Sequence, residues 1–187
     1  MNYNKSFSLL KNLPKKLNNF YSKNSRYSLR IKNKSKNKKN YDPVTNVDKD
    51  FEKFIRNIIV RQFPKDAITG EEFLEKYSDN DYKWYIDPID GTRAFMIGAP
   101  TWSNLIGLTH KDQPVLGLAN FPALNKFYIN DQKKSFLINN KKTILKTSKE
   151  TNLKKSKVIG HVHEWIFLKK NNNKIRKVMS SVSYFGA

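Results

Sequence analysis

Two stretches near the start of the chain carry apolar residues at helical spacing. In the first stretch these residues recur every three or four positions: Leu10, Leu13, Leu17, Phe20 and Tyr21. Pro14 lies among them and suits the first turn of a helix. The second stretch runs from Phe51 to Phe63, stops at Pro64, and has Thr45 and Asp48 at its entrance. We therefore expect two amphipathic helices, the second ending before Pro64.

After Pro64 the pattern changes to short apolar runs that are bounded by turn residues, which is typical of strands. The predicted strands are Trp84–Asp87, Asn104–Thr109, Val115–Asn120, Lys126–Asn130 and Ser135–Asn139. Short connections at residues 111–114 and 131–133 favour antiparallel neighbours over helical crossovers. The predicted class is α+β, with an antiparallel meander sheet packed on helices.

Composition narrows the chemistry that the chain can perform. With 187 residues, 38% of them hydrophobic, the chain can bury one sizeable core. No apolar run approaches the roughly 20 residues that span a bilayer, so we expect no membrane partner and a cytoplasmic location. The basic start of the chain also fits a mitochondrial-type presequence. Because the chain has 0 Cys, disulfides, thiolate zinc sites and cysteine nucleophiles are excluded, and a metal would bind oxygen or imidazole.

The formal charge of +20 raises nucleic-acid binding as an alternative function. Residues 41–100 hold 12 acidic and 8 basic side chains, a balance of −4, so the remainder of the chain carries +24. The lysines outside this segment alternate with asparagines and lack the interleaved aromatic residues on which bases stack. An AT-rich genome accounts for such a composition. A nucleic-acid partner is therefore not the leading interpretation.

The segment with the clearest chemistry is Asp87-Pro88-Ile89-Asp90-Gly91-Thr92, which directly follows the apolar run 84–86. A strand delivers Asp87 at its end, Pro88 stiffens the turn, and Asp90 returns three residues later, so both carboxylates can face one point. Gly91 allows close approach of the backbone to a ligand, and Thr92 begins a turn whose N–H groups can hold an anion. The segment thus combines two carboxylates with a cradle for phosphate.

Two upstream segments add carboxylates at the boundaries of predicted elements: Asp48 before the second helix and Glu71 in Gly70-Glu71-Glu72. Two unit charges about 4 Å apart repel by about 4 kcal/mol at an effective dielectric of 20, so four converging carboxylates need a cation. Oxygen ligands without cysteine favour Mg²⁺, Mn²⁺ or Ca²⁺, and a site with room for water and phosphate favours Mg²⁺. Taken singly, each segment has a structural explanation, as a helix cap, a turn or a solvated pair.

Three segments resemble, in order and spacing, the N-terminal motifs of the inositol monophosphatase superfamily: Asp42-Pro43-Val44-Thr45-x-x-Asp48, Gly70-Glu71-Glu72 and Asp87-Pro88-Ile89-Asp90-Gly91-Thr92. A further set is similar to the histidinol-phosphatase branch: Arg93-Ala94-Phe95, Gly98-x-Pro100-x-Trp102 and Leu105-Ile106. The resemblance implies the N-terminal part of a layered αβαβα sugar-phosphatase-like fold. It also implies Mg²⁺-dependent hydrolysis of a small phosphate monoester, with histidinol phosphate ahead of inositol phosphates, other sugar phosphates and nucleotides.

The resemblance assigns roles residue by residue. Glu71, Asp87 and the carbonyl of Ile89 would hold a first Mg²⁺, and Asp87 with Asp90 a second, in a site of two or three ions. Asp48 and Thr92 would orient and deprotonate the attacking water, for in-line attack on phosphorus, and Glu71 acts beside them. The N–H groups of Gly91 and Thr92 would receive the phosphate. An upstream lysine helps a metal-bound water in some members, and four residues compete for that role: Lys34, Lys36, Lys38 and Lys39.

Other residues and boundaries are assigned more simply. We read His110 as a turn residue and His161 with His163 as a surface pair that alternates along an extended segment. The expected organisation is a basic N-terminal helix or extension over residues 1–33 and a metal-binding α+β domain over 34–187. Members of the family continue with a second αβ region whose Trp-Asp or Tyr-Asp completes the second metal site, and this chain stops before it, so we expect a C-terminally truncated member. A homodimer and an inactive fragment are further expectations.

Overall fold

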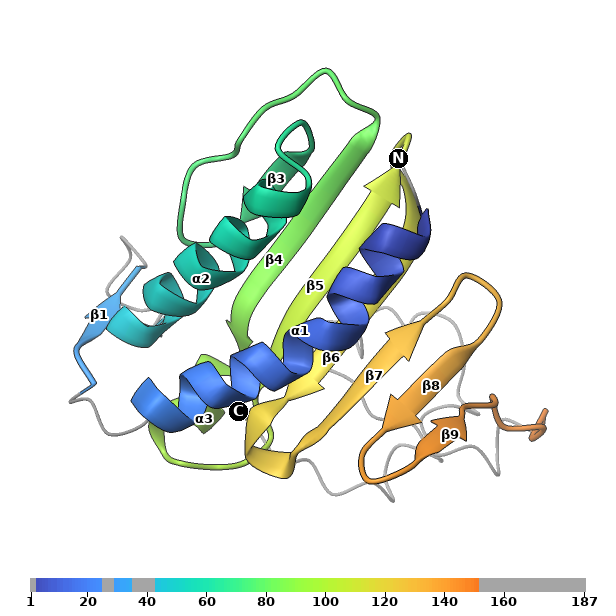
Figure 1. The fold of residues 1–187 in the computed structure, drawn as a ribbon. Coiled ribbons are helices and arrows are strands. Elements are labelled where there is room, and N and C mark those ends of the chain that lie inside the picture. The colour runs from blue at the N-terminus through green and yellow to red at the C-terminus, as the bar shows by residue number, and fades with distance from the viewer. Residues whose placement is uncertain (1–2, 25–28, 35–42, 152–187) are drawn as a thin grey trace, which may run out of the picture. The chain divides into compact units, whose positions relative to one another are not determined.

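The computed structural model describes residues 3–24, 29–34 and 43–151 of the chain. The chain divides into two compact units, residues 1–145 and 146–187, and the elements described below belong to the first. In this unit a seven-stranded sheet and two long helices enclose one core (Figure 1). The predicted class, α+β with an antiparallel meander on helices, is confirmed.

The main sheet has the order β3-β4-β5-β6-β7-β8-β9. Its strands are β3 (Ala67–Gly70), β4 (Tyr82–Asp90), β5 (Ser103–His110), β6 (Gln113–Phe121), β7 (Lys126–Asn130), β8 (Ser135–Ile138) and β9 (Lys142–Ile144). Only the β3–β4 pair is parallel, and every later neighbour is antiparallel. A separate antiparallel pair joins β1 (Ile31–Asn33) to β2 (Pro43–Thr45). The five predicted strands are all present, whereas β1, β2, β3 and β9, which span three or four residues each, were not predicted.

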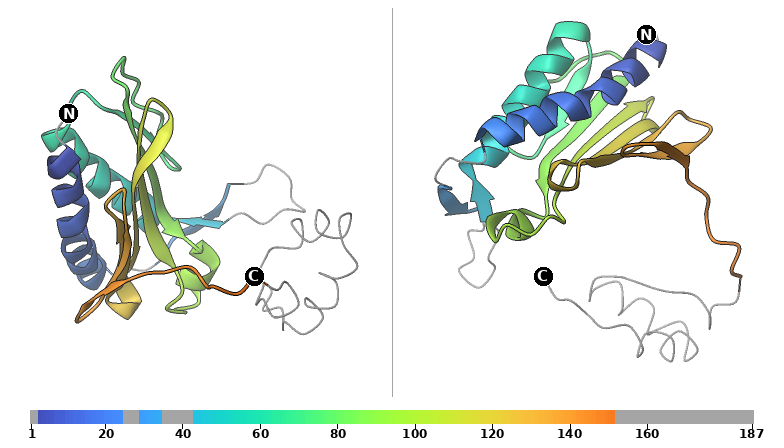
Figure 2. Two further views of the ribbon diagram at one scale, coloured as in Figure 1. Left: turned by 90° about the vertical axis from the view of Figure 1, so that its right-hand side faces the viewer. Right: turned by 60° about the horizontal axis from the view of Figure 1, so that its bottom comes forward.

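Two long helices, α1 (Tyr3–Asn24) and α2 (Asn46–Gln62), lie on the same face of the sheet (Figure 2). α2 packs on β4, and α1 packs on β6, β7 and the short 3₁₀ helix η1 (Pro122–Leu124). A third helix, α3 (Thr92–Met96), follows β4 directly. The opposite face of the sheet carries a groove of about 790 Å³ whose lining includes Tyr85, Asp87 and Leu105. The first unit is therefore a helix layer on one side of a sheet and a groove on the other.

The first helix is longer than expected, and Pro14 lies inside it rather than in its first turn. Proline inside a helix removes one backbone hydrogen bond and is costly. The burial of four leucines on one helix face outweighs that cost: Leu9, Leu10, Leu13 and Leu17 are all at most 5% exposed. These leucines share one core with the apolar face of α2 and with Trp84 of β4. α1 is thus an integral layer of the fold.

The second helix begins where the sequence predicted. Thr45 is the N-cap: its side chain accepts a hydrogen bond from the N–H of Val47, and the Asp48 carboxylate accepts one from the N–H of Thr45. The helix ends at Gln62, with Phe63 as C-cap directly before Pro64. Asp48 therefore has a structural role at the start of α2, in addition to any chemical one.

Two local expectations were wrong. β4 continues through Pro88 to Asp90, so Pro88 lies within a strand and not in a turn after it. His110 is the last residue of β5 rather than a turn residue, and its ring stacks on that of Tyr82 with centroids 4.4 Å apart. In both places tertiary packing extends a strand beyond the apolar run that predicted it. His161 and His163 lie outside the described residues.

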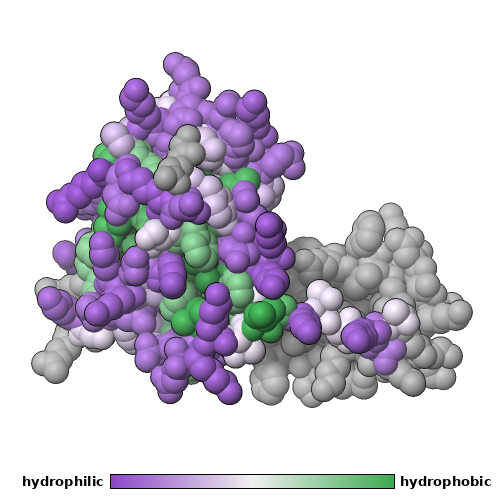
Figure 3. All heavy atoms as spheres, turned by 45° about the vertical axis from the view of Figure 1, so that its right-hand side comes forward, coloured by the Kyte–Doolittle hydropathy of each residue, from purple (hydrophilic) through white to green (hydrophobic). Residues whose placement is uncertain are grey.

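The surface of the unit is mainly polar. On the face drawn in Figure 3, hydrophilic side chains dominate, and hydrophobic side chains show between them in a limited band. The lysines of α1 contribute to the basic surface, since five of them are exposed: Lys5, Lys11, Lys15, Lys16 and Lys23. No helix in the described part of the chain is both long and apolar enough to cross a membrane.

We expect α1 to be required for the stability of the unit. Leu17 is fully buried, so Leu17→Ala should lower the free energy of unfolding by about 2–5 kcal/mol through lost burial and the cavity left behind. Lys16→Ala, at an exposed neighbouring position, is the control and should change it by less than about 0.5 kcal/mol. Urea unfolding followed by circular dichroism measures both. Equal midpoints for Leu17→Ala and the parent would show that α1 is not part of the core.

Candidate metal and phosphate site

An irregularity in β4 brings Asp87 and Asp90 to the same face of the sheet. Residues three apart in a regular strand point to opposite faces. In the pairing with β5, however, Asp87 lies opposite Leu105 and Asp90 opposite Ser103, with a register shift between the two pairs. Leu105 and Ser103 are two residues apart and share a face, so their partners do as well. The extra residue in β4 is a β-bulge, a feature that often re-aims side chains next to functional sites.

The Asp87 carboxylate lies in an environment that disfavours its charged form. Burial is the main cause, and the nearby carboxylates of Glu71, Asp90 and Asp48 add to it, so that the pKa of Asp87 rises to about 7. The N–H of Ile89 donates a hydrogen bond to this carboxylate, which lowers the pKa and opposes the other effects. One carboxylate oxygen, Oδ1, is buried and has no hydrogen-bond partner among the described residues. A buried oxygen of this kind is suited to a cation.

The loop after β3 is held by a carboxylate that the sequence analysis did not single out. Glu52 of α2 is fully buried; its side chain accepts hydrogen bonds from the N–H of Glu72 at 2.6 Å and of Phe73 at 3.3 Å. It also receives the Nε–H of Arg56 at 2.7 Å. A Cβ at Gly70 would lie 2.1 Å from Oε1 of Glu52, which explains the glycine before Glu71. The signal was present in the sequence, since Glu52 interrupts the apolar stripe of α2.

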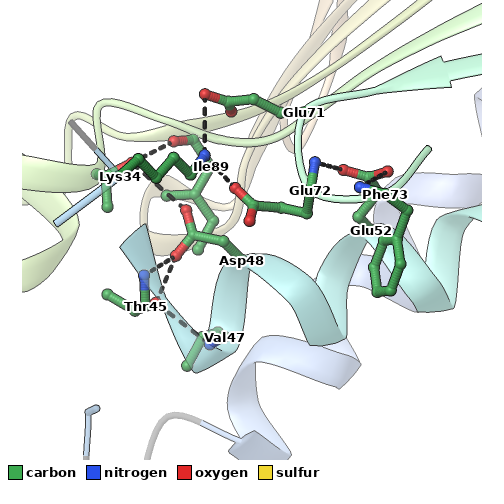
Figure 4. A network of polar contacts seen from close by, with 10 residues as sticks. Lys34, Thr45, Val47, Asp48, Glu52, Glu71, Glu72, Phe73 and Ile89 are labelled. Atoms are coloured by element: carbon green, nitrogen blue, oxygen red, sulfur yellow. Dashed lines mark hydrogen bonds and ion pairs between the residues drawn. The ribbon is translucent and has the colours of Figure 1, made fainter. Parts of the chain in front are cut away.

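Lys34 points between the two glutamates of this loop, as Figure 4 shows. Its Nζ lies 3.3 Å from Oε1 of Glu71 and makes a close ion pair with Glu72, whose side chain is only 2% exposed. Burial lowers the pKa of Lys34, but the hydrogen bonds and charges of Glu72 and Glu71 outweigh it and the net shift is upward. Lys34 is therefore a protonated neighbour of Glu71. The other three competing lysines (Lys36, Lys38 and Lys39) lie outside the described residues.

Asp48 and Thr92 connect the start of α2 to the end of β4. Asp48 is 1% exposed, and its Oδ2 accepts hydrogen bonds from the N–H and hydroxyl of Thr45. Its Oδ1 accepts from the Thr92 hydroxyl at 3.4 Å, and the same hydroxyl lies 3.0 Å from the carbonyl oxygen of Ile89. Thr92 thus contacts both the proposed base and a proposed metal ligand.

Gly91 separates the bulged strand from α3. Its φ of 83° lies in the left-handed region, which side chains other than glycine adopt only at a cost. The residue is the N-cap of α3, and Thr92 is the first residue of that helix. The N–H groups of Gly91 and Thr92 therefore lie where the strand turns into a helix, next to Asp90.

The predicted residues fit a hard cation by their chemistry, although they are not assembled as a finished metal site. Glu71, Asp87, Asp90 and the Ile89 carbonyl offer only oxygen donors, and Asp87 has an unpartnered buried oxygen. Within residues 3–24, 29–34 and 43–151, no group of three or more acidic or histidine side chains is close enough to hold a metal ion. Glu71 contacts Lys34, so part of the proposed donor set is engaged by an ammonium group.

Known proteins match about half of this chain. A histidinol-phosphatase of Chlorobaculum parvum is 45% identical over 91 residues, which cover 49% of this chain and 35% of that protein. A fructose-1,6-bisphosphatase/inositol-1-monophosphatase of Aquifex aeolicus is 36% identical over 87 residues, covering 46% of this chain and 33% of that protein. The matched segments thus span about a third of the length of these relatives.

A solved structure agrees with the fold. An IMPase/NADP phosphatase complexed with Mg²⁺ and phosphate superposes with a TM-score of 0.64 at 19% identity, covering 72% of this chain and 51% of its own. That identity supports the fold alone. The sequence profile of the Inositol monophosphatase family matches residues 11–184, nearly the whole chain. The chain therefore belongs to the inositol monophosphatase family.

Proposed function

We propose that this protein takes part in Mg²⁺-dependent hydrolysis of a small phosphate monoester, with histidinol phosphate as the preferred substrate. The observation that carries the proposal is the bulge in β4, which places Asp87 and Asp90 on one face next to Glu71. Carboxylates gathered in this way repel one another unless a cation neutralises them. The family membership of the chain gives the reaction class, since phosphatases are among its relatives.

Glu71, Asp87, Asp90 and the carbonyl of Ile89 would hold Mg²⁺, with two or three ions in the complete site. Bound Mg²⁺ supplies a water nucleophile at neutral pH and neutralises charge on the phosphate oxygens. The Asp48 carboxylate, held by the cap of α2, accepts the hydrogen bond of Thr92 and so orients its hydroxyl. In the proposed reaction this pair positions the water and takes up its proton.

The phosphate would lie at the turn from β4 to α3. The N–H groups of Gly91 and Thr92 lie at this turn, where Gly91 has a left-handed backbone and caps α3. Backbone N–H groups bind phosphate without adding mobile side chains, which lowers the ordering cost. The Lys34 ammonium, between Glu71 and Glu72, keeps a positive charge near the same region.

The choice of substrate rests on local sequence. Arg93-Ala94-Phe95 and the segment from Gly98 to Trp102 resemble the histidinol-phosphatase branch, and one relative with that name is 45% identical over 91 residues. A relative named for inositol-1-monophosphatase activity makes inositol 1-phosphate the second candidate. Mg²⁺-dependent phosphate release by the intact protein from histidinol phosphate, inositol 1-phosphate and fructose 1,6-bisphosphate distinguishes them by kcat/KM. A preference for either of the latter two would overturn the histidinol assignment.

We expect Glu71→Gln and Asp90→Asn to weaken divalent-ion binding by this chain. Each variant keeps the side-chain volume and removes a charge from the proposed donor set, so the Mn²⁺ or Mg²⁺ dissociation constant should rise at least tenfold. Calorimetric titration of the 187-residue chain measures it. Glu75→Gln is the matched control, because Glu75 pairs with Lys83 away from the site, and it should bind as the parent does. Parent affinity in both test variants would refute the site.

Asp87→Asn should stabilise the metal-free chain in a pH-dependent way. The pKa of Asp87 is about 7 in the folded chain against an ordinary 3.8, so the folded state binds the proton more tightly. Below about pH 4 the Asp87 carboxyl is protonated in the folded and unfolded states alike and does not lower the free energy of unfolding. Between about pH 4 and pH 7 it lowers that free energy increasingly as pH rises, and above about pH 7 the loss stays constant. The gain in Tm of Asp87→Asn over the parent should follow that course. Mg²⁺ should raise the Tm of the parent and leave that of the variant unchanged.

The control for this measurement is Asp50→Asn, an exposed acid on α2 whose removal should give no such pH dependence. A constant difference in Tm between Asp87→Asn and the parent from pH 4 to pH 8 would contradict the burial of Asp87. A Tm of Asp87→Asn below that of the parent at pH 8 without metal would contradict it as well.

Thr92→Val should separate water orientation from metal binding in the intact protein. The variant keeps the branched shape and loses the hydroxyl that contacts Asp48 and the Ile89 carbonyl. We expect kcat to fall by about 10²-fold or more, while the Mg²⁺ concentration for half-maximal rate changes little. Thr109→Val, whose hydroxyl contacts only a strand carbonyl at 3.4 Å, is the control. A normal kcat at saturating Mg²⁺ would refute the role of Thr92.

A further inference from the structure

Three asparagine side chains form a hydrogen-bonded chain from α1 to the bulge in β4. Nδ2 of Asn104 lies 2.6 Å from the carbonyl oxygen of Pro88. Nδ2 of Asn120 lies 2.9 Å from Oδ1 of Asn104 and 3.0 Å from Oδ1 of Asn18. Asn104 and Asn120 are both fully buried and directly opposite each other on β5 and β6. These hydrogen bonds thus connect α1, through β6 and β5, to the Asp-Pro-Ile-Asp segment of β4.

The direction of these hydrogen bonds is fixed at one end. The Pro88 carbonyl can only accept, so Asn104 must present its NH₂ group to it and its oxygen to Asn120. Asn120 must then present its own NH₂ group, and its two hydrogens serve Asn104 and Asn18. Oδ1 of Asn120 remains without a hydrogen-bond partner in the described part of the chain. The three amides therefore have one consistent orientation.

Asn104 occupies the one position on β5 that faces the bulge. Its neighbours Ser103 and Leu105 pair with Asp90 and Asp87, so this single residue lies opposite both Pro88 and Ile89. The regular ladder is interrupted there, and the side chain of Asn104 supplies a donor to the bulged backbone. Asn104 points to the helix side of the sheet, whereas Asp87 and Asp90 share the other face.

The contact to Pro88 fixes a peptide plane with consequences on the opposite face. The carbonyl of Pro88 and the N–H of Ile89 belong to the same planar peptide, so anchoring one orients the other. That N–H acts on the Asp87 carboxylate, and the carbonyl of Ile89 in the next peptide receives the Thr92 hydroxyl at 3.0 Å. Asn104 therefore controls the backbone that carries three of the proposed metal ligands.

Stability alone is a poor explanation for these amides. The residues that share their face of β5 and β6 are apolar and buried, among them Ile106, Leu116 and Leu118. An amide with an unpartnered oxygen costs stability in such surroundings, where an apolar side chain would not. These hydrogen-bonded amides lower stability and end on the bulge. The simplest explanation is that they position the bulge.

We propose that Asn104 and Asn120 are positioning residues for the metal site. They hold the β4 bulge so that Asp87, Asp90 and the Ile89 carbonyl can bind the same cation. The proposal rests on the proposed function, because it assigns these residues to the support of that site. Asn18 extends the support to α1, so the helix layer contributes to the geometry of a site on the far face of the sheet.

Asn104→Leu tests the proposal in the 187-residue chain, since leucine is close in volume and removes the donor to Pro88. Calorimetry should show the dissociation constant for Mn²⁺ rising roughly tenfold or more, as for other residues that support metal ligands. In ¹⁵N–¹H spectra of the metal-free chain, the Ile89 amide should shift and exchange its hydrogen faster. Asn120→Leu, the second variant, should move both readouts in the same direction by a smaller amount.

Leu118→Ala is the matched control, because it removes buried volume from the same face of β6 and takes away no hydrogen-bonding group of the three amides. It should leave Mn²⁺ affinity within about twofold and the Ile89 amide in place. Parent affinity together with an unchanged Ile89 amide in Asn104→Leu overturns the proposal, and so does an equal loss of affinity in Leu118→Ala. In a further outcome, the parent binds no Mn²⁺ while the Ile89 amide still shifts and exchanges faster in Asn104→Leu. In that case the proposed function fails, and the role of Asn104 in holding the β4 bulge stands.

Discussion

The arrangement of the site depends on one extra residue in an antiparallel ladder. Two carboxylates separated by an odd number of positions cannot share a face of a regular strand, yet Asp87 and Asp90 do so. The bulge achieves this without a loop, so both carboxylates remain within β4. Its cost is an interrupted ladder and a half-buried acid with a raised pKa. Both costs are local, and a bound cation would offset the second.

Near the site, buried polar side chains form hydrogen bonds with backbone groups wherever the chain departs from regular secondary structure. Glu52 receives the N–H groups of the loop after β3, and Asn104 serves the bulge. Thr45 and Asp48 serve the start of α2 in the same way. Each group satisfies backbone atoms that secondary structure leaves unpaired. The bulge and the loop that carry Asp87, Asp90 and Glu71 are therefore held in place by hydrogen bonds from other buried side chains.

Periodicity in the sequence predicted both long helices, five of the strands and the capping role of Thr45 and Asp48, since each depends on local spacing. It missed four short strands and the interior position of Pro14, which follows from burial of the α1 leucines. The motif predicted that Asp87 and Asp90 face one point, but by a turn rather than a bulge, which only the pairing with β5 reveals. Glu52 and Asn104 contact groups 20 and 16 positions away along the chain, so local spacing does not identify their partners, although Glu52 does interrupt the apolar stripe of α2.

The first two turns of α2 set the distance between two segments of the site. Asp48 holds the strand that precedes the helix and meets Thr92, while Glu52, one turn further on, holds the loop that carries Glu71. A residue inserted between them would rotate one carboxylate by about 100° relative to the other. The interval is thus intolerant of length variation, whereas the hairpin turn at residues 131–134 could grow without moving either anchor. In an evolving family, insertions should collect in the hairpins and avoid this single turn of helix.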